Sequence, residues 1–392
     1  MKSSKAFLMF AFTLMIAACS GDKPTQLGIS QPSASPVPAA SATPAEPPAT
    51  LAPVPAKFRR TLVGLIDGKH AVVMELSRTK SDAEDSSELY GTYRYKKVQK
   101  KSLSLSGKVA KDGTVELTET ADDKETGIFI GKLVLEIRGD DSRLKFTGNW
   151  KKSKSDPKAL PFELAETRFD LGGLRLVSKE QTEENKKQKQ TIDIQYPQLV
   201  GADAAKTDAF NKAMNEFVAK QTNAFRKNVK EMMADRTDAG DWPGNDLDIS
   251  YTTTYADKNL ISVLVWTYQY TGGAHGGSSS TTFNYDLQNG RLLKLADLFQ
   301  PNSGYLKVIA NYCTAALIKD IGQEADQEWL RNGAAPKADN YKSWCLTDDG
   351  LQITFDAYQV AAYAFGPQEV IVPYSALKEI IKPDSPLAAL AK

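Results

Sequence analysis

Short runs in which apolar and polar residues alternate recur through residues 57–170. They include 103–106, 115–118 and 144–147, and a Lys-Asp-Gly sequence at 111–113 marks a turn. A period of two is the pattern of a strand with one buried face, and closely spaced turn residues join such strands into hairpins. This region is therefore predicted to hold about eight strands in an antiparallel meander, forming a small barrel or a sandwich.

Helical and strand periodicities succeed one another in residues 191–382. Between 203 and 233, apolar residues recur three, four and seven positions apart, which predicts an amphipathic helix, and a second one is predicted at 302–321. Strands are predicted at 192–196, 247–255, 260–270, 281–287, 344–346, 351–355 and 368–373. Because these elements lack a regular βαβ order, the region is predicted to be an α+β domain with an antiparallel sheet.

Polar residues set the predicted domain boundaries. Residues 171–190 include the sequence EQTEENKKQK and are predicted to be a polar connector. Residues 383–392 are predicted to be a tail. The 392-residue chain is thus expected to contain two folded domains.

The N-terminus has the parts of an export signal. A charged start, an apolar segment at 6–16 and small residues before Cys19 predict a signal peptide over residues 1–18. The Ile-Ala-Ala-Cys at 16–19 resembles the lipobox of bacterial lipoproteins, which implies lipidation of Cys19; an ordinary signal with a chance cysteine is the alternative. Ser20, where an aspartate would favour the inner membrane, favours the outer membrane facing the periplasm. Residues 19–56 are rich in Pro, Ala and Ser and are predicted to be an extended tether.

Two further cysteines, Cys313 and Cys345, follow in the second region. Exported proteins fold in an oxidising compartment, so this pair is predicted to form a disulfide. Two buried free thiols are the alternative. A metal site at these cysteines is disfavoured because no histidine lies nearby in sequence.

Composition and motifs exclude several classes of function. A net charge of +1 lacks the basic excess of nucleic-acid-binding proteins. The chain has no glycine-rich phosphate loop, no metalloprotease motif and no Gly-x-Ser-x-Gly, so no cofactor is expected. Two histidines are too few for a three-histidine zinc site. A carboxylate pair for glycan hydrolysis stays open, although its candidates are common near strands: Asp246, Asp248, Asp286, Asp297, Asp348 and Asp356.

One of the two histidines lies in a glycine-rich stretch, residues 270–277, which read YTGGAHGG. One interpretation is a flexible hairpin loop that happens to contain His275. The other is a recognition loop, because glycines leave backbone amides accessible and aromatic residues flank the stretch on both strands.

Several motifs resemble one family of exported domains. The residues that carry the resemblance are 194–197, 270–276, 282–286, 290–299, 351–355, 358–366 and 370–374. Together they are similar to the extracytoplasmic domain of RsiV-type anti-sigma factors, which also accompanies peptidoglycan deacetylases such as PdaC. The resemblance covers residues 190–382 and implies an α+β domain outside the cytoplasm. In the RsiV-type members this domain binds lysozyme. The chain departs from these relatives because it shows no transmembrane helix, no sigma-binding segment and no deacetylase domain.

The sequence therefore favours a lipid-anchored envelope protein that works by binding rather than by catalysis. Its expected ligand is lysozyme or a peptidoglycan-like glycan. The residues expected to contact the ligand are Tyr268, Tyr270, Gly272, Gly273, His275, Gly276, Phe283, Tyr358 and Tyr363. Two alternatives stay open: a cell-wall glycan hydrolase with His275 as acid or base, and a structural envelope lipoprotein.

Overall fold

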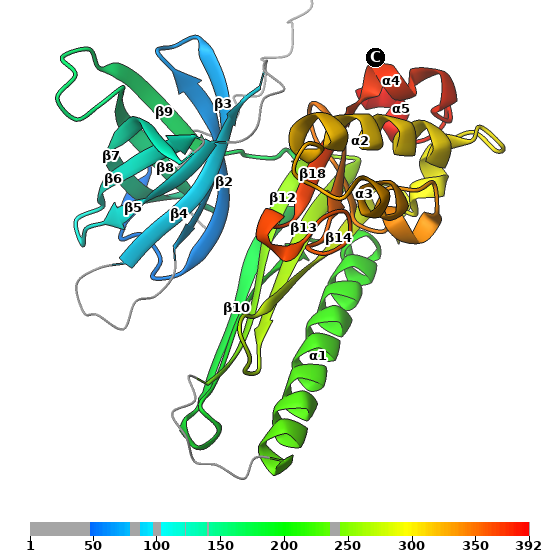
Figure 1. Cartoon of the computed structure of the whole chain (residues 1–392), viewed down its shortest axis with the longest axis horizontal. Coiled ribbons are helices and arrows are strands. Elements are labelled where there is room, and N and C mark those ends of the chain that lie inside the picture. Colours follow the sequence, from blue (N-terminus) through cyan, green and yellow to red (C-terminus); the bar gives the residue numbers. More distant parts are fainter. Residues whose placement is uncertain are drawn as a thin grey trace, which may run out of the picture. The chain divides into compact units, whose positions relative to one another are not determined.

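In the computed structural model, which describes residues 48–78, 87–96, 103–121, 123–138, 141–235 and 244–391, the first folded region is a closed β-barrel (Figure 1). Each strand pairs antiparallel with the next in sequence, and β9 pairs with β2 to close the ring. The strands are β2 (Phe58–Ile66), β3 (His70–Arg78), β4 (Ser87–Tyr95), β5 (Leu103–Val109), β6 (Thr114–Ala121), β7 (Lys124–Arg138), β8 (Asp141–Lys151) and β9 (Leu160–Glu166). The predicted meander is confirmed, and it is a barrel rather than a sandwich.

A buried carboxylate lies among the apolar side chains of the barrel. Glu119 is 4% exposed and accepts three hydrogen bonds: from the Tyr93 hydroxyl (2.5 Å), the Trp150 indole N–H (2.7 Å) and the Thr126 hydroxyl (2.7 Å). Burial, together with the bond to Glu119, raises the pKa of Tyr93, which keeps this phenol protonated as a donor. The buried carboxylate of Glu119 is thus satisfied by hydrogen bonds from the chain.

The predicted signal peptide, Cys19 and the first part of the tether lie outside the described residues. The end of the tether is extended but belongs to the folded barrel. Thr50–Ala52 form β1, which pairs with Leu135–Ile137 of β7. The long strand β7 continues past the end of its neighbour β6, so its edge is open there and accepts a short additional strand.

A six-stranded sheet forms the base of the second folded region. Its order is β10 (Arg175–Asn185), β11 (Gln190–Val200), β12 (Asn245–Ala256), β13 (Leu260–Tyr270), β14 (Gly277–Asp286) and β15 (Arg291–Leu292). All neighbours are antiparallel except β11 and β12, which are parallel and are connected through helix α1 (Ala204–Asp235). This βαβ unit was not anticipated, but the α+β class is confirmed.

Strand β10 corrects the predicted connector at 171–190. It is the edge strand of the sheet and pairs with β11 along its whole length. An edge strand with an exposed face needs no apolar alternation, and charged side chains on such a strand oppose pairing with other chains. Its polar, Glu-rich sequence therefore has the composition of a connector.

The long helix α1 covers one face of the six-stranded sheet. Its stripe of Phe210, Met214, Val218, Phe225 and Val229 is buried against strand residues that include Ile192, Ile194 and Val263. At the start of the helix, the Asn211 amide both donates to and accepts from the backbone of Leu199, which joins α1 to the end of β11. The predicted helical stripe is core, as expected from its period.

A smaller sheet and several helices pack on the six-stranded sheet on the side opposite α1. The sheet contains β16 (Trp344–Leu346), β17 (Gly350–Phe355) and β18 (Gln368–Pro373). The helices are α2 (Tyr305–Ile321), α3 (Gln327–Gly333), α4 (Tyr374–Leu377) and α5 (Leu387–Leu390), with short 3-10 turns η2 (Leu295–Leu298), η3 (Ala338–Tyr341), η4 (Tyr363–Phe365) and η5 (Lys378–Ile380). A further 3-10 turn, η1 (Lys186–Gln188), joins β10 to β11. The predicted tail is partly wrong, because Leu387 of α5 is fully buried in the core beneath α2.

The predicted disulfide is also wrong. Cys313 and Cys345 are both free and buried, and burial raises the pKa of each thiol to about 12. Trp344 and Leu346 face the core that contains Cys313, whereas Cys345 lies between them in β16 and packs on Leu264 and Trp266. Successive side chains of a strand point to opposite faces, so the two thiols occupy different cores.

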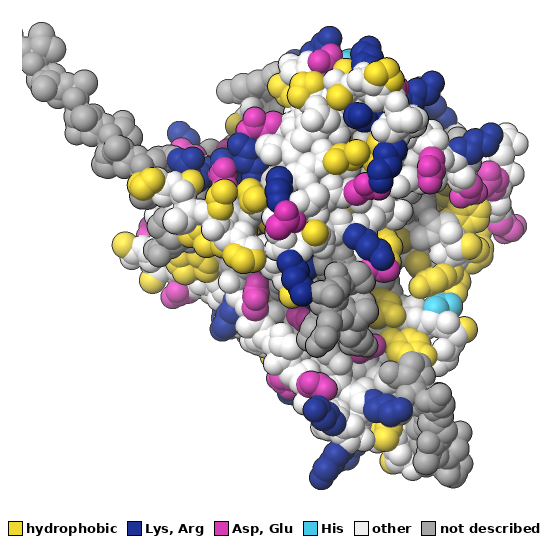
Figure 2. Space-filling view, turned by 90° about the vertical axis from the view of Figure 1, so that its left-hand side faces the viewer, with side chains coloured by type: hydrophobic (Ala, Val, Ile, Leu, Met, Phe, Trp, Pro, Cys, Tyr) yellow, Lys and Arg dark blue, Asp and Glu magenta, His cyan; other side chains and the backbone are white. Residues whose placement is uncertain are grey.

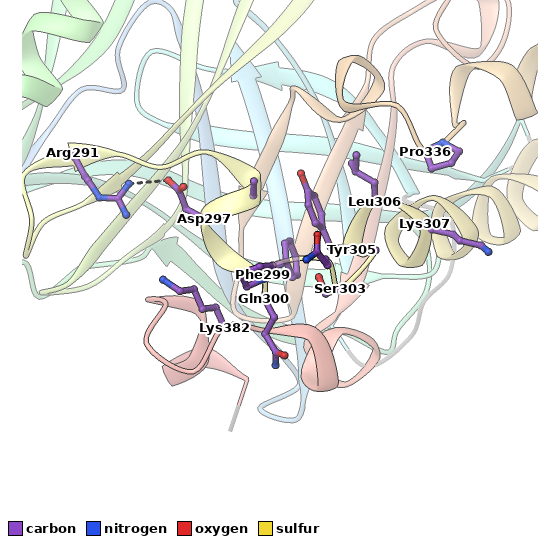
Figure 3. Close-up of a pocket in the computed structure, with 14 residues that line it drawn as sticks. Arg291, Asp297, Phe299, Gln300, Ser303, Tyr305, Leu306, Lys307, Pro336 and Lys382 are labelled. Atoms are coloured by element: carbon purple, nitrogen blue, oxygen red, sulfur yellow. Dashed lines mark hydrogen bonds and ion pairs between the residues drawn. The ribbon is translucent and has the colours of Figure 1, made fainter.

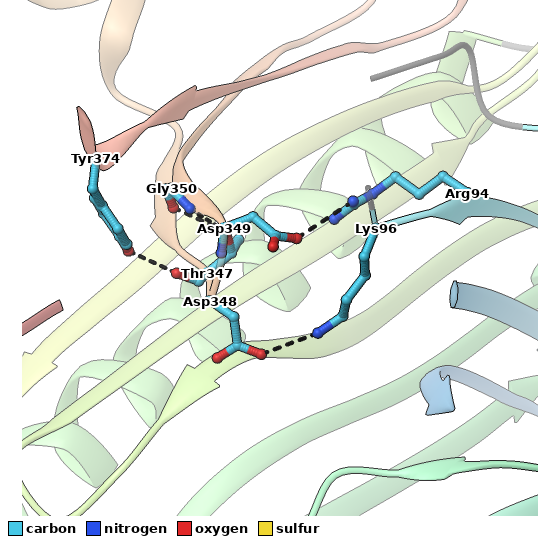
Figure 4. A network of polar contacts seen from close by, with 7 residues as sticks. All are labelled: Arg94, Lys96, Thr347, Asp348, Asp349, Gly350 and Tyr374. Carbon is cyan, nitrogen blue, oxygen red and sulfur yellow. Dashed lines mark hydrogen bonds and ion pairs between the residues drawn. The ribbon is translucent and has the colours of Figure 1, made fainter. Parts of the chain in front are cut away.

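Charged side chains connect the barrel to the second region. Lys57 forms ion pairs with Asp193 (3.3 Å) and Asp248. Figure 4 shows a second group, in which Lys96 pairs with Asp348 (3.3 Å) and Arg94 pairs with Asp349 (3.5 Å). The Arg59 guanidinium lies 4.9 Å from the Trp266 ring centroid, a cation–π contact that covers part of the sheet face opposite α1.

The surface carries both signs of charge. Lysines and arginines are interspersed with aspartates and glutamates over the face drawn in Figure 2, and hydrophobic side chains gather there in small groups. No helix among the described residues combines the length and the hydropathy needed to cross a membrane.

Candidate functional site

The glycine-rich stretch is the loop between β13 and β14. Gly272 (φ 100°) and Gly273 (φ 94°) have left-handed backbone conformations that disfavour other residues. The Tyr270 hydroxyl donates to the Gly273 carbonyl (3.1 Å) and braces this turn. The chain thus reverses direction before His275 and leaves that side chain exposed.

His275 stacks on an aromatic ring that lies far away in sequence. Its imidazole and the Tyr363 ring are 3.9 Å apart between centroids and only 16° from parallel. The Tyr363 hydroxyl donates to the Gly276 carbonyl (3.1 Å), and the same carbonyl lies 2.9 Å from His275 Nδ1. Tyr363, at the start of η4, therefore holds the tip of the loop from the opposite segment.

Gly276 is required for the close packing at this point. It is buried, and a Cβ built on it would lie 2.4 Å from the ring of Tyr268. That distance is far below any real contact between carbon atoms. A glycine here lets the loop tip lie directly on the Tyr268 ring.

Two further aromatic side chains extend the cluster into solvent. Tyr358 is 52% exposed, has φ 70°, and its ring centroid lies 5.5 Å from that of Tyr363. The Trp329 indole donates to the Tyr358 carbonyl (3.0 Å) and is 38% exposed, while Tyr268 is 37% exposed. We call the exposed rings of Tyr268, His275, Trp329 and Tyr358, held around Tyr363, the aromatic surface.

Eight of the nine residues expected at the ligand contact come together here. They are Tyr268, Tyr270, Gly272, Gly273, His275, Gly276, Tyr358 and Tyr363. The exception is Phe283, which is only 8% exposed and packs against Phe217 of α1 at 5.5 Å between centroids. It pairs with Val263 and so faces α1, whereas Tyr268 lies on the other face of β13.

Trp329 is a member of the surface that the sequence interpretation missed. The Asp326 side chain accepts from the Trp329 backbone N–H and caps α3, so this tryptophan stands in the first turn of a short polar helix. A lone indole within the sequence ADQEWLRNG was the available signal. A large aromatic ring without an apolar stripe around it is typical of a contact residue.

Asp356, one of the candidate carboxylates, is hydrogen-bonded to a serine rather than to a second carboxylate or to His275. The Ser280 hydroxyl and backbone N–H both donate to Asp356 (2.6 and 2.9 Å), and burial raises the pKa of that carboxyl while these bonds oppose the rise. Among the described residues, no carboxylate is hydrogen-bonded to His275. No three His, Cys, Asp or Glu side chains of the described residues are grouped as metal ligands.

The other strand-associated aspartates are also engaged. Asp286 is buried and accepts from the backbone of Gln288 and Asn289. Asp297 pairs with Arg291, Asp348 with Lys96, and Asp248 with Lys57. Asp246 is exposed and forms no ion pair among the described residues, but it accepts a hydrogen bond from the Thr191 side chain.

A separate hollow of about 700 Å³ lies at the N-terminus of α2 (Figure 3). Phe299 and Tyr305 stack at its wall, with centroids 4.8 Å apart. Arg291 pairs with Asp297 (2.8 Å) and Lys382 with Asp384 (3.2 Å). Two of its cations are thus matched within the chain, and the aromatic surface is the stronger candidate for a ligand site.

Two family models match adjoining parts of the second region. Residues 183–278 match the model described as "Deacetylase PdaC", and residues 296–375 match "Protein of unknown function (DUF3298)". The first match contains Tyr268 and His275, and the second contains Trp329, Tyr358 and Tyr363. The aromatic surface is therefore assembled from both matched segments.

Curated relatives are similar over about a third of the chain. The peptidoglycan-N-acetylmuramic acid deacetylase PdaC of Bacillus subtilis is 33% identical over 138 residues, which is 35% of this chain and 30% of that protein. The immunogenic protein MPT64 of Mycobacterium tuberculosis is 24% identical over 137 residues, 35% of this chain and 59% of that protein. The chain thus spans less than two thirds of either relative.

Two crystal structures of DUF3298 proteins are also similar. One from Bacteroides fragilis has a TM-score of 0.45 and 22% identity, covering 57% of this chain and 99% of that one. One from Pseudomonas aeruginosa has a TM-score of 0.41 and 18% identity, covering 54% and 94%. The family matches and the relative from Bacillus subtilis confirm the expected resemblance to PdaC: the second region of this chain is a PdaC/DUF3298-like domain.

Proposed function

We propose that the PdaC/DUF3298-like domain binds the glycan strands of peptidoglycan through the aromatic surface. The observation that carries this proposal is the group of exposed rings at the β13–β14 loop, held by the stack of His275 on Tyr363. The relative from Bacillus subtilis, whose name assigns it to peptidoglycan, supports the choice of ligand.

Sugar rings suit such a surface for a physical reason. The face of a pyranose ring presents C–H groups with partial positive charge, and the face of an aromatic ring is negative. Tyrosine and tryptophan supply large contact areas with few side-chain torsions to immobilise, so little entropy is lost on binding. The Tyr363 hydroxyl and the Asp326 cap fix this geometry before the ligand arrives.

The sequence supports a location in the cell envelope. The lipobox-like residues before Cys19 and the Pro- and Ala-rich segment after it support a lipid anchor with a tether, and Ser20 supports the outer membrane. Expression of Cys19→Ser in a bacterial host tests this anchor. The variant should move from the membrane fraction to the soluble fraction, and an unchanged distribution would contradict lipid anchoring.

A titration with soluble, lysozyme-released peptidoglycan fragments tests glycan binding. Tyr358→Ala in the full chain should weaken binding about tenfold, because it removes an exposed ring worth roughly 1–1.5 kcal/mol. Tyr90→Ala is the matched control, since Tyr90 is 45% exposed but lies on the barrel. Equal loss in both variants, or no saturable binding by the parent chain, would overturn the proposal.

Lysozyme is the other occupant suggested by the sequence, and the same variants distinguish it. Binding of purified lysozyme that is lost in Tyr358→Ala, without binding of glycan fragments, would replace the glycan by a protein partner. Released sugars or acetate after incubation with intact peptidoglycan would show turnover and replace binding by catalysis.

A further inference from the structure

The sheet register places carboxylates directly beside the aromatic surface. In the antiparallel pair of β12 and β13, Asp248 is opposite Tyr268 and Asp246 is opposite Tyr270. Directly opposed residues share a face of the sheet and have Cβ atoms about 5 Å apart. The two aspartates therefore lie on the face that carries Tyr268, away from α1.

These two carboxylates have different environments. Asp248 pairs with Lys57. Lys57 also pairs with Asp193, which lies opposite Asp248 on the neighbouring parallel strand β11. Asp246 is exposed and forms no ion pair among the described residues, although the Thr191 hydroxyl donates a hydrogen bond to it and the charge of Lys57 acts on it. Burial raises the pKa of Tyr268, and the negative charge of Asp246 adds to this effect, which indicates that the two groups are close.

We infer that the aromatic surface takes an amino sugar with a free ammonium group, a de-N-acetylated residue of a glycan strand, whose ring packs on Tyr268 and Tyr358 and whose charge faces Asp246. This inference deepens the proposed glycan binding and rests on it. The surface is committed to a cationic sugar because Asp246, the carboxylate beside the rings, forms no ion pair among the described residues.

Two forces act together on such a ligand. An ammonium group is attracted both to a carboxylate and to the negative faces of tyrosine and tryptophan rings. An N-acetyl group replaces the ammonium by a neutral amide and removes both attractions. The same glycan with and without the acetyl group is therefore a direct probe of the carboxylate.

The test compares two tetrasaccharides in titrations of the full chain, one of glucosamine and one of N-acetylglucosamine, at a pH where the amine is protonated. The glucosamine tetramer should bind about tenfold more tightly. Asp246→Asn, which keeps the shape and removes the charge, should abolish this preference and leave binding of the acetylated tetramer unchanged. Asp320→Asn, an exposed aspartate on α2, is the matched control and should have no effect.

The outcomes separate the inference from the proposal beneath it. Equal binding of both tetramers, with Tyr358→Ala weakening both, would overturn the ammonium preference and leave glycan binding intact. A preference that persists in Asp246→Asn would also overturn the assignment of this carboxylate. Binding of neither tetramer and of no peptidoglycan fragment would overturn both.

Discussion

The barrel and the PdaC/DUF3298-like domain each place aromatic rings beside a carboxylate, but in opposite relation to solvent. In the barrel, Glu119 is buried and every contact from Tyr93, Trp150 and Thr126 is a hydrogen bond. At the aromatic surface, Tyr358 and Trp329 are exposed and Asp246 lacks an ion pair among the described residues.

This difference separates groups that stabilise a fold from groups available to a ligand. A buried carboxylate needs all its bonds from the chain, because water cannot supply them. Exposed rings contribute little to folding, and holding them in place favours binding. Substitutions around Glu119 should therefore lower stability, whereas substitutions at the aromatic surface should lower affinity for the ligand.

Phe283→Ala should give the largest loss of stability. Phe283 lies on β14, the strand that follows the loop, but packs on Phe217 of α1. Its substitution should therefore affect stability, as expected for the buried residues of the barrel. The loss of packing and the resulting cavity should cost about 3–5 kcal/mol, measured by chemical denaturation. Glycan affinity of the folded fraction should be unchanged, and an effect on affinity alone would return Phe283 to the ligand contact.

Glu119→Leu should come next, at about 2–4 kcal/mol. It removes the carboxylate that accepts from the buried Tyr93 hydroxyl and from the half-buried Trp150 indole. Glu119→Gln, which keeps an acceptor oxygen, should cost less. Thermal unfolding followed by circular dichroism measures both, and equal stability of all three proteins would show that the barrel does not depend on this cluster.

Gly276→Ala should shift the loop at a smaller cost, about 1–3 kcal/mol, because the new methyl group meets the Tyr268 ring. Glycan affinity should fall several-fold as the aromatic surface is displaced. Gly277→Ala is a matched control, since no atom lies within 4 Å of a Cβ at that position. If the two substitutions have the same effect in calorimetric titrations, the packing on Tyr268 is not what holds the loop.

Asp348→Asn should have the smallest effect. It removes the ion pair with Lys96 between the barrel and the second region, but the Asp348 side chain is 69% exposed. Exposed pairs contribute less than about 1 kcal/mol and are screened by salt. The difference in thermal midpoint from the parent chain should shrink further at high salt; a large, salt-independent loss would mean that this contact governs the fold.

Much of this fold could be predicted from periodicity. The period of two predicted the barrel meander, and the helical stripe predicted α1, because these elements bury one face. Strand β13 is buried on both faces and was predicted from its run of apolar residues instead. Edge strand β10 was missed since it buries little, and the polar composition of its residues 175–185 resembles that of a loop. The parallel pairing of β11 and β12 leaves no local signal at all.

The site was predictable in its residues more than in its geometry. The glycines and tyrosines of 268–276 identified the loop, but only the fold brings Tyr363 onto His275. Phe283 and Tyr268 look alike in sequence, and their opposite roles follow from which face of the sheet each occupies. The face of β16 on which Cys345 lies likewise keeps it apart from Cys313, which is in the core beside α2.

Hydrogen–deuterium exchange of the full chain, with and without soluble peptidoglycan fragments, tests the central claim most directly. Bound glycan should protect two segments, the β13–β14 loop around Gly272–Gly276 and the segment from Tyr358 to Tyr363, and leave the barrel strands β2 to β9 unchanged. Protection confined to the barrel, or none in either segment at saturating ligand, would contradict glycan binding at the aromatic surface.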